Sequence, residues 1–247
     1  MDALVRAAAG ATAAAWALIA PVECAGCSAP DVVLCPACAG DLRPRPRAAT
    51  LDGPVGAVPL VSPLLYEGVA RRVILALKEG DRTELAGALR PAVLAAVESA
   101  CAGVTPGAPP LLVPVPGGAS GAARRGYHPA ELLARRAGLP VTRVLRPARG
   151  RARAQKRLTL AHRREIDPSR WSVSPRVRGA RVVLLDDVVT SGSTLRAAVD
   201  ALSTAGAEVV ACAAIAATPR RVGESSILWR ISDDPLGGID DNREAGD

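Results

Sequence analysis

Two adjacent carboxylates and a group of small hydroxylated residues follow an apolar run in the C-terminal third of the sequence. Residues 182–185 are all aliphatic, Asp186 and Asp187 come next, and small polar residues follow around Gly192. Ligands of open α/β sheets bind beyond the carboxyl ends of the strands. A turn of small residues that leads into a helix exposes N–H groups and hydroxyls at the positive end of the helix dipole, where anions bind. Carboxylates that accept hydrogen bonds from a diol, beside such an anion site, predict a ligand of the ribose 5-phosphate type.

The predicted anion loop contains no Gly-Lys-Ser/Thr, so the pattern does not favour a nucleoside triphosphate loop of the Walker kind. Its glycine would let the backbone approach a ligand closely. The residues of the predicted ligand site are Asp186, Asp187, Val188, Thr190, Ser191, Gly192, Ser193 and Thr194. The alternative is purely structural: the two acids would form an ordinary turn, with Ser193 as the N-cap of the following helix.

Four of the six cysteines form two C-x-x-C pairs that are separated by seven residues. This spacing predicts a zinc site, and a structural one, because four sulfur ligands leave no open coordination position. The predicted ligands are Cys24, Cys27, Cys35 and Cys38. Disulfides, which are disfavoured in a cytosolic chain, and chance clustering are the alternatives. Cys101 and Cys212 stand among apolar residues and are predicted to be buried packing residues.

The chain has 247 residues, of which 49% are hydrophobic and only 2% aromatic, with no Phe. This composition provides a packed core that must be built from Ala, Val and Leu. No apolar run reaches the roughly 18 residues of a transmembrane helix. Ala rather than Leu dominates the N-terminal segment, and its one early Arg is offset by an Asp, so a signal peptide is not favoured. We therefore expect a cytoplasmic protein.

The excess of positive over negative charge lies in one segment. The formal net charge is +7, and nine Arg or Lys residues without a single acid lie between residues 143 and 164. Such a segment favours phosphate-bearing partners. It would close over a pyrophosphate, contact single-stranded nucleic acid, or be no more than a solvated charged loop. Of the aromatic side chains that strand binding uses, only Trp171 is near, so nucleic-acid contact would be mainly electrostatic.

Apolar periodicity predicts alternating helices and strands. We expect helices at residues 66–78, 83–100 (bent at Pro91), 129–137 and 193–205, and strands at residues 111–116, 141–145, 182–185 and 209–215. Residues 43–54, rich in Pro and Arg, are typical of a linker. The alternation predicts an α/β fold with a mostly parallel twisted sheet flanked by helices. We divide the chain into an N-terminal helix and cysteine module (1–46), an α/β domain (47–220) and a polar, partly disordered tail (221–247).

The stretch VVLLDDVVTSGSTL resembles the motif with which type I phosphoribosyltransferases bind 5-phosphoribosyl 1-pyrophosphate (PRPP). The cysteine pairs, YEGVARRVILALK, VPVPGGASGAARRGYHPAELLA and AQKRLTLAHRR, in this order, narrow the resemblance to the ComF family of competence-associated proteins. Members of that family pair an N-terminal zinc ribbon with a phosphoribosyltransferase-like domain. The resemblance covers roughly residues 20 to 218.

The resemblance implies roles for individual residues. Asp186 and Asp187 would bind the ribose diol and position it for catalysis, and residues 190–194 would bind the 5-phosphate. Arg124 and Arg125 would lie on the pyrophosphate side, with Arg125 acting in catalysis. The flexible hood that closes over the reacting centre would include Gln155, Lys156 and Arg163. Mg²⁺ would accompany PRPP.

The sequence departs from the family pattern at His128, Pro129 and Ile166, where relatives usually carry Asn, Gln and Asn. These departures would weaken turnover or alter the acceptor. The first hypothesis is therefore a Mg²⁺-dependent phosphoribosyltransferase, a pentosyl-transfer enzyme that acts on PRPP. The alternatives are a competence factor that binds single-stranded DNA together with the DNA-uptake machinery, and a PRPP-sensing regulator without turnover.

Overall fold

The computed structural model describes residues 22–53, 56–117, 125–148, 171–219 and 227–230. Its helices are α2 (Pro36–Gly40), α3 (Gly68–Glu79), α4 (Arg90–Ala102), α6 (Pro129–Arg136) and α7 (Ser193–Thr204), with 3₁₀ turns at Thr83–Ala86 and Pro175–Val177. Its strands are β1 (Arg47–Gly53), β2 (Gly56–Ser62), β3 (Leu64–Leu65), β4 (Leu111–Pro114), β5 (Leu145–Pro147), β6 (Trp171–Val173), β7 (Arg181–Val189), β8 (Glu208–Ala217) and β9 (Ile227–Arg230). Among the described residues, none of the helices is both long and apolar enough to cross a bilayer.

The principal sheet has the strand order β4-β7-β8-β2-β1-β9, and β3 also pairs with β8. Strands β4, β7, β8 and β2 run parallel, whereas β1 pairs antiparallel with both β2 and β9. Strands β5 and β6 form a separate antiparallel pair. The predicted α/β class with a mostly parallel sheet is confirmed.

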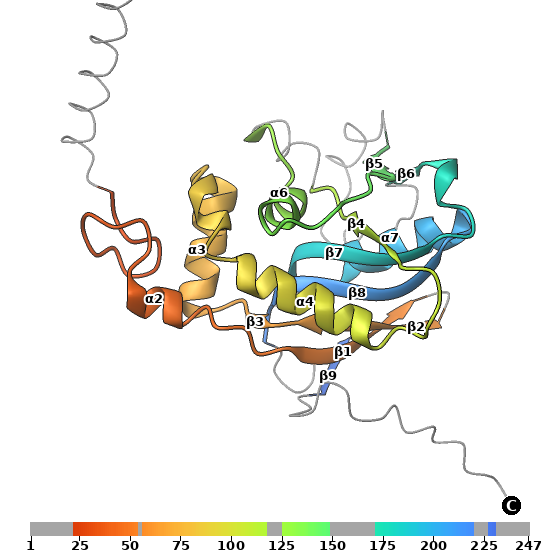
Figure 1. Ribbon diagram of the computed structural model, residues 1–247, viewed down its shortest axis with the longest axis horizontal. Coiled ribbons are helices and arrows are strands. Elements are labelled where there is room, and N and C mark those ends of the chain that lie inside the picture. The colour runs from red at the N-terminus through yellow and green to blue at the C-terminus, as the bar shows by residue number, and fades with distance from the viewer. Residues whose placement is uncertain (1–21, 54–55, 118–124, 149–170, 220–226, 231–247) are drawn as a thin grey trace, which may run out of the picture.

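Helices cover both faces of the sheet (Figure 1). Helix α7 packs on one face, and α4 and α6 pack on the other. Along β7, Val182 and Leu184 belong to the core beneath α7, whereas Val183 and Leu185 belong to the core beneath α4 and α6. Both faces of the strand are therefore apolar, as expected for a strand buried in a parallel sheet.

Small side chains fill the layer between α4 and the sheet. Ala96 and Ala100 of α4 share one buried cluster with Ala211 and Ala213 of β8. Each of these side chains is at most 3% exposed. The core is thus built largely without aromatic residues, as the composition predicts.

Two predicted elements differ from the structure. The helix expected at residues 83–100 is a 3₁₀ turn followed by α4, and Pro91 stands in the first turn of α4 instead of bending one long helix. This position suits proline because the first N–H groups of a helix have no helical acceptor. The strand expected at 141–145 begins only at Leu145, where β5 pairs with β6 rather than with the principal sheet.

The segment predicted to be a linker contains a strand. Residues 47–53 form β1, which pairs with β2 on one side and β9 on the other. Local composition gave no sign of β1 or of β9, because both strands depend on partners remote in sequence. Cys212 is fully buried, as predicted, whereas Cys101 is only partly buried.

Candidate functional site

Asp186 and Asp187 lie within β7, close to its carboxyl end. The strand had been expected to stop at Leu185, but it continues to Val189 because its last residues pair with β8, Asp186 opposite Ala214 and Val189 opposite Ala217. Successive side chains of a strand point to opposite faces. The two side chains start from opposite faces of the strand, but their carboxyl groups interact with each other, and the backbone N–H of Asp187 donates to Oδ1 of Asp186 (2.8 Å).

Asp187 is held by a lysine from a different part of the chain. Nζ of Lys78, in the last turn of α3, lies 3.1 Å from Oδ2 and 3.2 Å from Oδ1 of Asp187. The Asp187 side chain is only 11% exposed, and that of Lys78 is 27% exposed. The lysine thus compensates a carboxylate that would otherwise be largely desolvated.

Asp186 has a different electrostatic environment. Burial raises the pKa of Asp186 above its usual range, and repulsion from the neighbouring Asp187 raises it further. The hydrogen bond from the Asp187 N–H and the charge of Lys78 act in the opposite direction. The two neighbouring carboxyl groups therefore differ: that of Asp186 favours its protonated form, and that of Asp187 is paired with the Lys78 cation.

The small residues after β7 form a turn into α7. Gly192 has a φ of 74°, in the left-handed region that favours glycine, and is buried directly before the first residue of α7. Oγ of Ser191 lies 3.0 Å from Oγ of Ser193. Gly192, rather than Ser193, occupies the N-cap position, so the alternative in which Ser193 caps the helix is not what the structure has. The first N–H groups of α7 have no helical acceptor and face the same end of the sheet as the acids.

A buried arginine fixes this turn. Arg196 of α7 is 7% exposed and donates from Nη1 to the carbonyl oxygen of Ser191 (3.0 Å) and from Nε to that of Asp52, in β1 (2.9 Å). The turn is therefore anchored to both α7 and β1. An anion site built from backbone groups depends on such support, because the groups must be in place before the ligand arrives.

Arg125 begins the segment that leads into α6. Its Nε is buried and, among the described residues, lacks a hydrogen-bond partner. Four residues predicted for the pyrophosphate side and the hood lie outside the described residues: Arg124, Gln155, Lys156 and Arg163.

The four clustered cysteines come together as one group. Their sulfur atoms all lie within 4.8 Å of one another, and the Sγ atoms of Cys27 and Cys35 are 3.7 Å apart. A tetrahedral zinc ion with Zn–S bonds of about 2.3 Å would place its sulfurs about 3.8 Å apart. Backbone N–H groups of Gly26 and Cys35 donate to Sγ of Cys24, at 3.4 and 3.3 Å. The donor set and its spacing therefore fit a tetrahedral metal ion.

Hydrogen bonding favours thiolate at one of these cysteines. The N–H of Cys35, followed by those of neighbouring residues, lowers the pKa of Cys24 to about 6 against the effect of burial. In Cys38, burial acts without such compensation and raises the pKa. A bound cation would supply the missing stabilisation of thiolate, because ligation deprotonates a thiol.

The cysteine module packs directly on α3 (Figure 1). Nε of Arg72 donates to the carbonyl oxygen of Gly26, and a Cβ placed on Gly26 would lie 3.1 Å from Cγ1 of Val69. The same helix ends at Lys78, and the carbonyl oxygen of its Leu77 accepts a hydrogen bond from the Tyr127 hydroxyl. One helix therefore contacts the cysteine module with its first half and Asp187 with its last turn.

Sequence reasoning missed Lys78 and Arg196 as site residues. Lys78 closes the motif YEGVARRVILALK, and Arg196 follows directly after the acid-and-hydroxyl loop. The available signal was that each cation stands in or directly after a motif quoted for the family resemblance. Their partners are remote in sequence, so only the fold identifies them.

Three comparisons with known proteins each found a similarity. Residues 120–243 match the model of the phosphoribosyl transferase domain. A 38-residue stretch is 55% identical to orotate phosphoribosyltransferase of Bartonella tribocorum and covers 15% of this chain and 20% of that protein. A solved structure, that of the allosteric regulatory enzyme of purine biosynthesis, is 26% identical with a TM-score of 0.31, over 51% of this chain and 25% of the other. The chain thus spans a quarter or less of the length of these two proteins.

Proposed function

The chain belongs to the phosphoribosyl transferase domain family, and from this premise we propose that it binds PRPP at the carboxyl end of β7 and transfers the phosphoribosyl group. Asp186 and Asp187 accept hydrogen bonds from the ribose hydroxyls, and the turn from Thr190 to Thr194 binds the 5-phosphate. The observation that carries the proposal is the acid pair beside the N-terminus of α7, where Arg196 ties the turn to β1.

The reaction would be a displacement at C1 of the ribose. A nucleophile forms a bond to C1, the C1–O bond to pyrophosphate breaks, and pyrophosphate departs with that electron pair. Arg125, whose buried Nε has no described partner, would bind the leaving group. Arg124 and the residues assigned to the hood, Gln155, Lys156 and Arg163, would contribute from the same side. Mg²⁺, which binds phosphates together with few protein ligands, supplies further charge stabilisation when bound.

The test is binding of PRPP in the presence of Mg²⁺, measured by titration calorimetry. The loss of each ribose contact should cost about tenfold in affinity, which corresponds to about 1.4 kcal/mol. The double substitution Asp186→Asn/Asp187→Asn should therefore weaken binding by about a hundred-fold. Glu98→Ala, which removes an exposed carboxylate on α4, is the control and should bind like the parent. Unchanged affinity in the folded double variant would refute the assignment.

We further propose that the four cysteines hold a structural zinc ion. The proposal is supported by four sulfurs within 4.8 Å of one another and by N–H groups that donate to Cys24. Four thiolates leave no coordination position for a substrate, so the ion would act in folding rather than in the reaction. We place the protein in the cytoplasm, where thiols stay reduced and available to a metal ion.

A second candidate function is that of a ComF-type competence factor that binds single-stranded DNA, with partners in the DNA-uptake machinery. It is supported by the cysteine module at the start of the chain and by the nine cations between residues 143 and 164. Single-stranded binding through three to five phosphates would fall with salt at a log–log slope of roughly −2 to −3.5. A PRPP-sensing role without turnover would instead show PRPP binding and no release of pyrophosphate with any acceptor.

A further inference from the structure

The segment that joins α2 to β1 contains an arginine–proline repeat. From Arg43 to Arg47 every second residue is an arginine, and the residues between them, Pro44 and Pro46, are prolines. Proline disfavours the helical region for the residue before it, so Arg43 and Arg45 are held extended. Successive side chains of an extended chain point to opposite sides. The repeat therefore presents its three guanidinium groups on one side of the chain.

The three arginines of the repeat line a cavity of about 370 Å³, which we call the arginine cavity. It lies between the end of α2, the chain around β3 and the first residues of α3. The two prolines of the repeat do not line it, in agreement with the alternation of the side chains. The volume is at the small end of the range for ligand pockets, roughly 300–1,000 Å³. The arginine cavity therefore suits a small molecule.

The principal sheet holds the repeat in place. The N–H of Arg45 donates to the carbonyl oxygen of Pro63 (2.9 Å), which also lines the cavity. Arg47 is the first residue of β1 and pairs in register with Ser62 of β2, and its Nη1 donates to the carbonyl oxygen of Arg45 (3.1 Å). The backbone that carries the arginines is thus positioned before a ligand arrives, which lowers the cost of binding.

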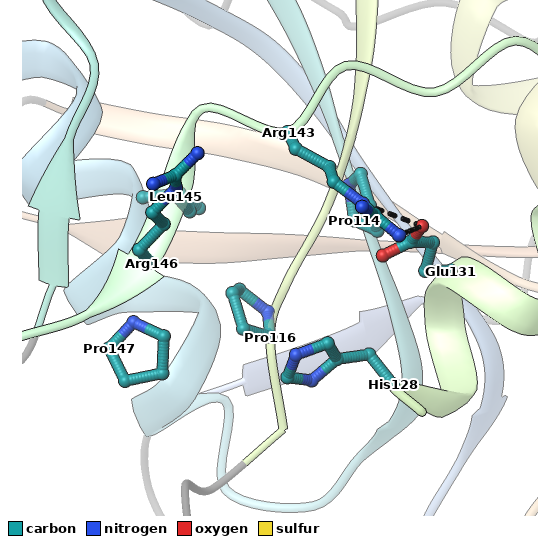
Figure 2. Close-up of a pocket in the computed structure, with 8 residues that line it drawn as sticks. All are labelled: Pro114, Pro116, His128, Glu131, Arg143, Leu145, Arg146 and Pro147. Carbon is teal, nitrogen blue, oxygen red and sulfur yellow. Dashed lines mark hydrogen bonds and ion pairs between the residues drawn. The ribbon is translucent and has the colours of Figure 1, made fainter. Parts of the chain in front are cut away.

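The arginines of the repeat differ from an arginine that lines another cavity, beside α6. There, Nε of Arg143 donates to Oε1 of Glu131 (2.7 Å), as Figure 2 shows. Glu131 is only 6% exposed, so this ion pair is a fixed part of the wall. Within the described part of the chain, Arg43, Arg45 and Arg47 form no ion pair. Their charge is therefore available to an anionic ligand.

Positive charge exceeds negative charge in the arginine cavity. Asp41 and Glu67 line it together with the three arginines, which leaves a surplus of one positive charge. Both acids are exposed, and neither is paired with a cation among the described residues. The planar fork of an arginine binds phosphate with two parallel hydrogen bonds, whereas a carboxylate accepts hydrogen bonds from hydroxyl groups. The charged lining therefore fits a ligand that carries both phosphate and hydroxyl groups.

The remaining wall is partly apolar. Leu65 and Val69 line the cavity and are half-buried, so a ligand can cover the part of each side chain that is still exposed. No aromatic side chain of the described residues lines it. Single-stranded nucleic acid is usually held by aromatic side chains on which its bases stack. A phosphorylated small molecule is therefore favoured over a nucleic-acid strand.

The arginine cavity is separate from the proposed PRPP site. Gly68, the first residue of α3, lines the cavity, whereas Lys78, in the last turn of the same helix, is paired with Asp187. At about 1.5 Å per residue, Gly68 and Lys78 are roughly 15 Å apart along the helix. A ligand in the arginine cavity therefore does not compete with one at the carboxyl end of β7.

We propose that the arginine cavity is a second ligand site, and that its ligand is a nucleotide with at least two phosphate groups. The three arginines bind the phosphates, because three guanidinium groups can engage more than one of them. The two carboxylates accept hydrogen bonds from the sugar hydroxyls, and the base packs on Leu65 and Val69. This inference goes beyond the proposed function and does not depend on it.

The experiment is calorimetric titration of ADP, GDP, CDP and UDP into the full chain, without Mg²⁺, which would itself occupy phosphate oxygens. At least one nucleotide should bind, and its nucleoside should bind about a hundred-fold more weakly because it lacks the phosphates. Pyrophosphate, which lacks the sugar and the base, should bind about ten-fold more weakly than that nucleotide. These three probes separate the contribution of the phosphates from that of the rest of the ligand.

Variants assign the binding to the cavity. Arg43→Gln/Arg45→Gln changes two exposed residues, leaves Arg47 in β1, and should weaken nucleotide binding by about ten-fold or more. Arg90→Gln/Arg176→Gln removes the same charge from exposed positions outside the cavity and should bind like the parent. Asp186→Asn/Asp187→Asn should also bind the nucleotide like the parent, because those acids belong to the other site.

Each contrary outcome overturns a stated part of the inference. If none of the four nucleotides binds, or if the arginine variant binds as tightly as the parent, the inference is wrong. It is also wrong if the control variant loses as much affinity as the arginine variant, because net charge alone would then explain binding. Pyrophosphate that binds as tightly as the nucleotide would contradict the sugar and base contacts. Loss of binding only in the aspartate variant would place the nucleotide at the proposed PRPP site instead.

Discussion

The ion pair between Lys78 and Asp187 gives the sharpest quantitative prediction. Replacing Lys78 with Met retains much of the side-chain length and apolar contact and removes only the charge. The carboxylate of Asp187, 11% exposed, is then left without the cation that lies 3.1 and 3.2 Å from its oxygens. We expect the variant to fold but with lower stability and with weaker binding of PRPP.

The size of the effect follows from the geometry. At about 3 Å and an effective dielectric constant near 20, the direct attraction is about 5 kcal/mol. Desolvation of both groups and the ordering of the lysine side chain offset roughly half of it. Hydrogen bonds to charged groups contribute about 1.5–3 kcal/mol net. We therefore expect Lys78→Met to lower the free energy of unfolding by about 2–3 kcal/mol, which corresponds to roughly 4–12 °C in Tm for a chain of this size.

The assay is a double-mutant cycle with Asp187→Asn, measured by denaturant unfolding. When both partners are removed, no unpaired charge remains buried, so the double variant should be more stable than the sum of the single effects implies, by at least about 1 kcal/mol. Arg71→Met, which removes an exposed cation from the same helix, is the matched control and should change stability by less than about 0.5 kcal/mol. If the two single effects add, the pair contributes no specific coupling, and the argument for Lys78 is refuted.

Further predictions concern the metal and the acid pair. Protein purified without added metal should contain about one zinc per chain by elemental analysis, and less than about a tenth of an equivalent with free thiols intact would contradict the site. Gly26→Ala should lower the zinc content, because the new Cβ would lie 2.4 Å from Sγ of Cys38, whereas Gly40→Ala, with nothing within 4 Å, should not. The raised pKa of Asp186 means that the folded state retains a proton that the unfolded chain has lost, so stability should fall as the pH rises from about 4 through that raised value. Thermal unfolding across this range should show a flatter profile for Asp186→Asn, and an unchanged profile would count against the environment described for Asp186.

The sequence predicted best those elements whose structure is determined by residues close together in the chain. The apolar run before Asp186 and the small residues around Gly192 predicted the strand, the turn and the helix α7 in their correct order. The length of β7 was underestimated because its last residues pair with β8, which local pattern does not show. The strand β1 was mistaken for a linker for the same reason.

The supporting contacts of the site were beyond sequence reasoning. Asp187 and Lys78 are separated by 109 residues, and Arg196 and Asp52 by 144. A charged residue in an amphipathic helix is usually solvated. The neighbouring residues in the sequence therefore gave no reason to assign a partner to Lys78 or to Arg196. Cys101 shows the opposite error, since apolar neighbours in sequence did not bury it fully.

The alanine-rich layer between α4 and β8 has a consequence for how this chain tolerates substitution. Where Leu or Phe fills a core, the common damage is truncation, which leaves a void. In this layer, truncation can remove little volume, because four of its buried side chains are already alanine: Ala96, Ala100, Ala211 and Ala213. Any replacement other than Gly adds volume between a helix and a sheet that already touch. Inserting methylene groups into such a layer costs about 1–3 kcal/mol each time. At these four positions, substitutions are therefore expected to destabilise the protein by crowding rather than by loss of packing.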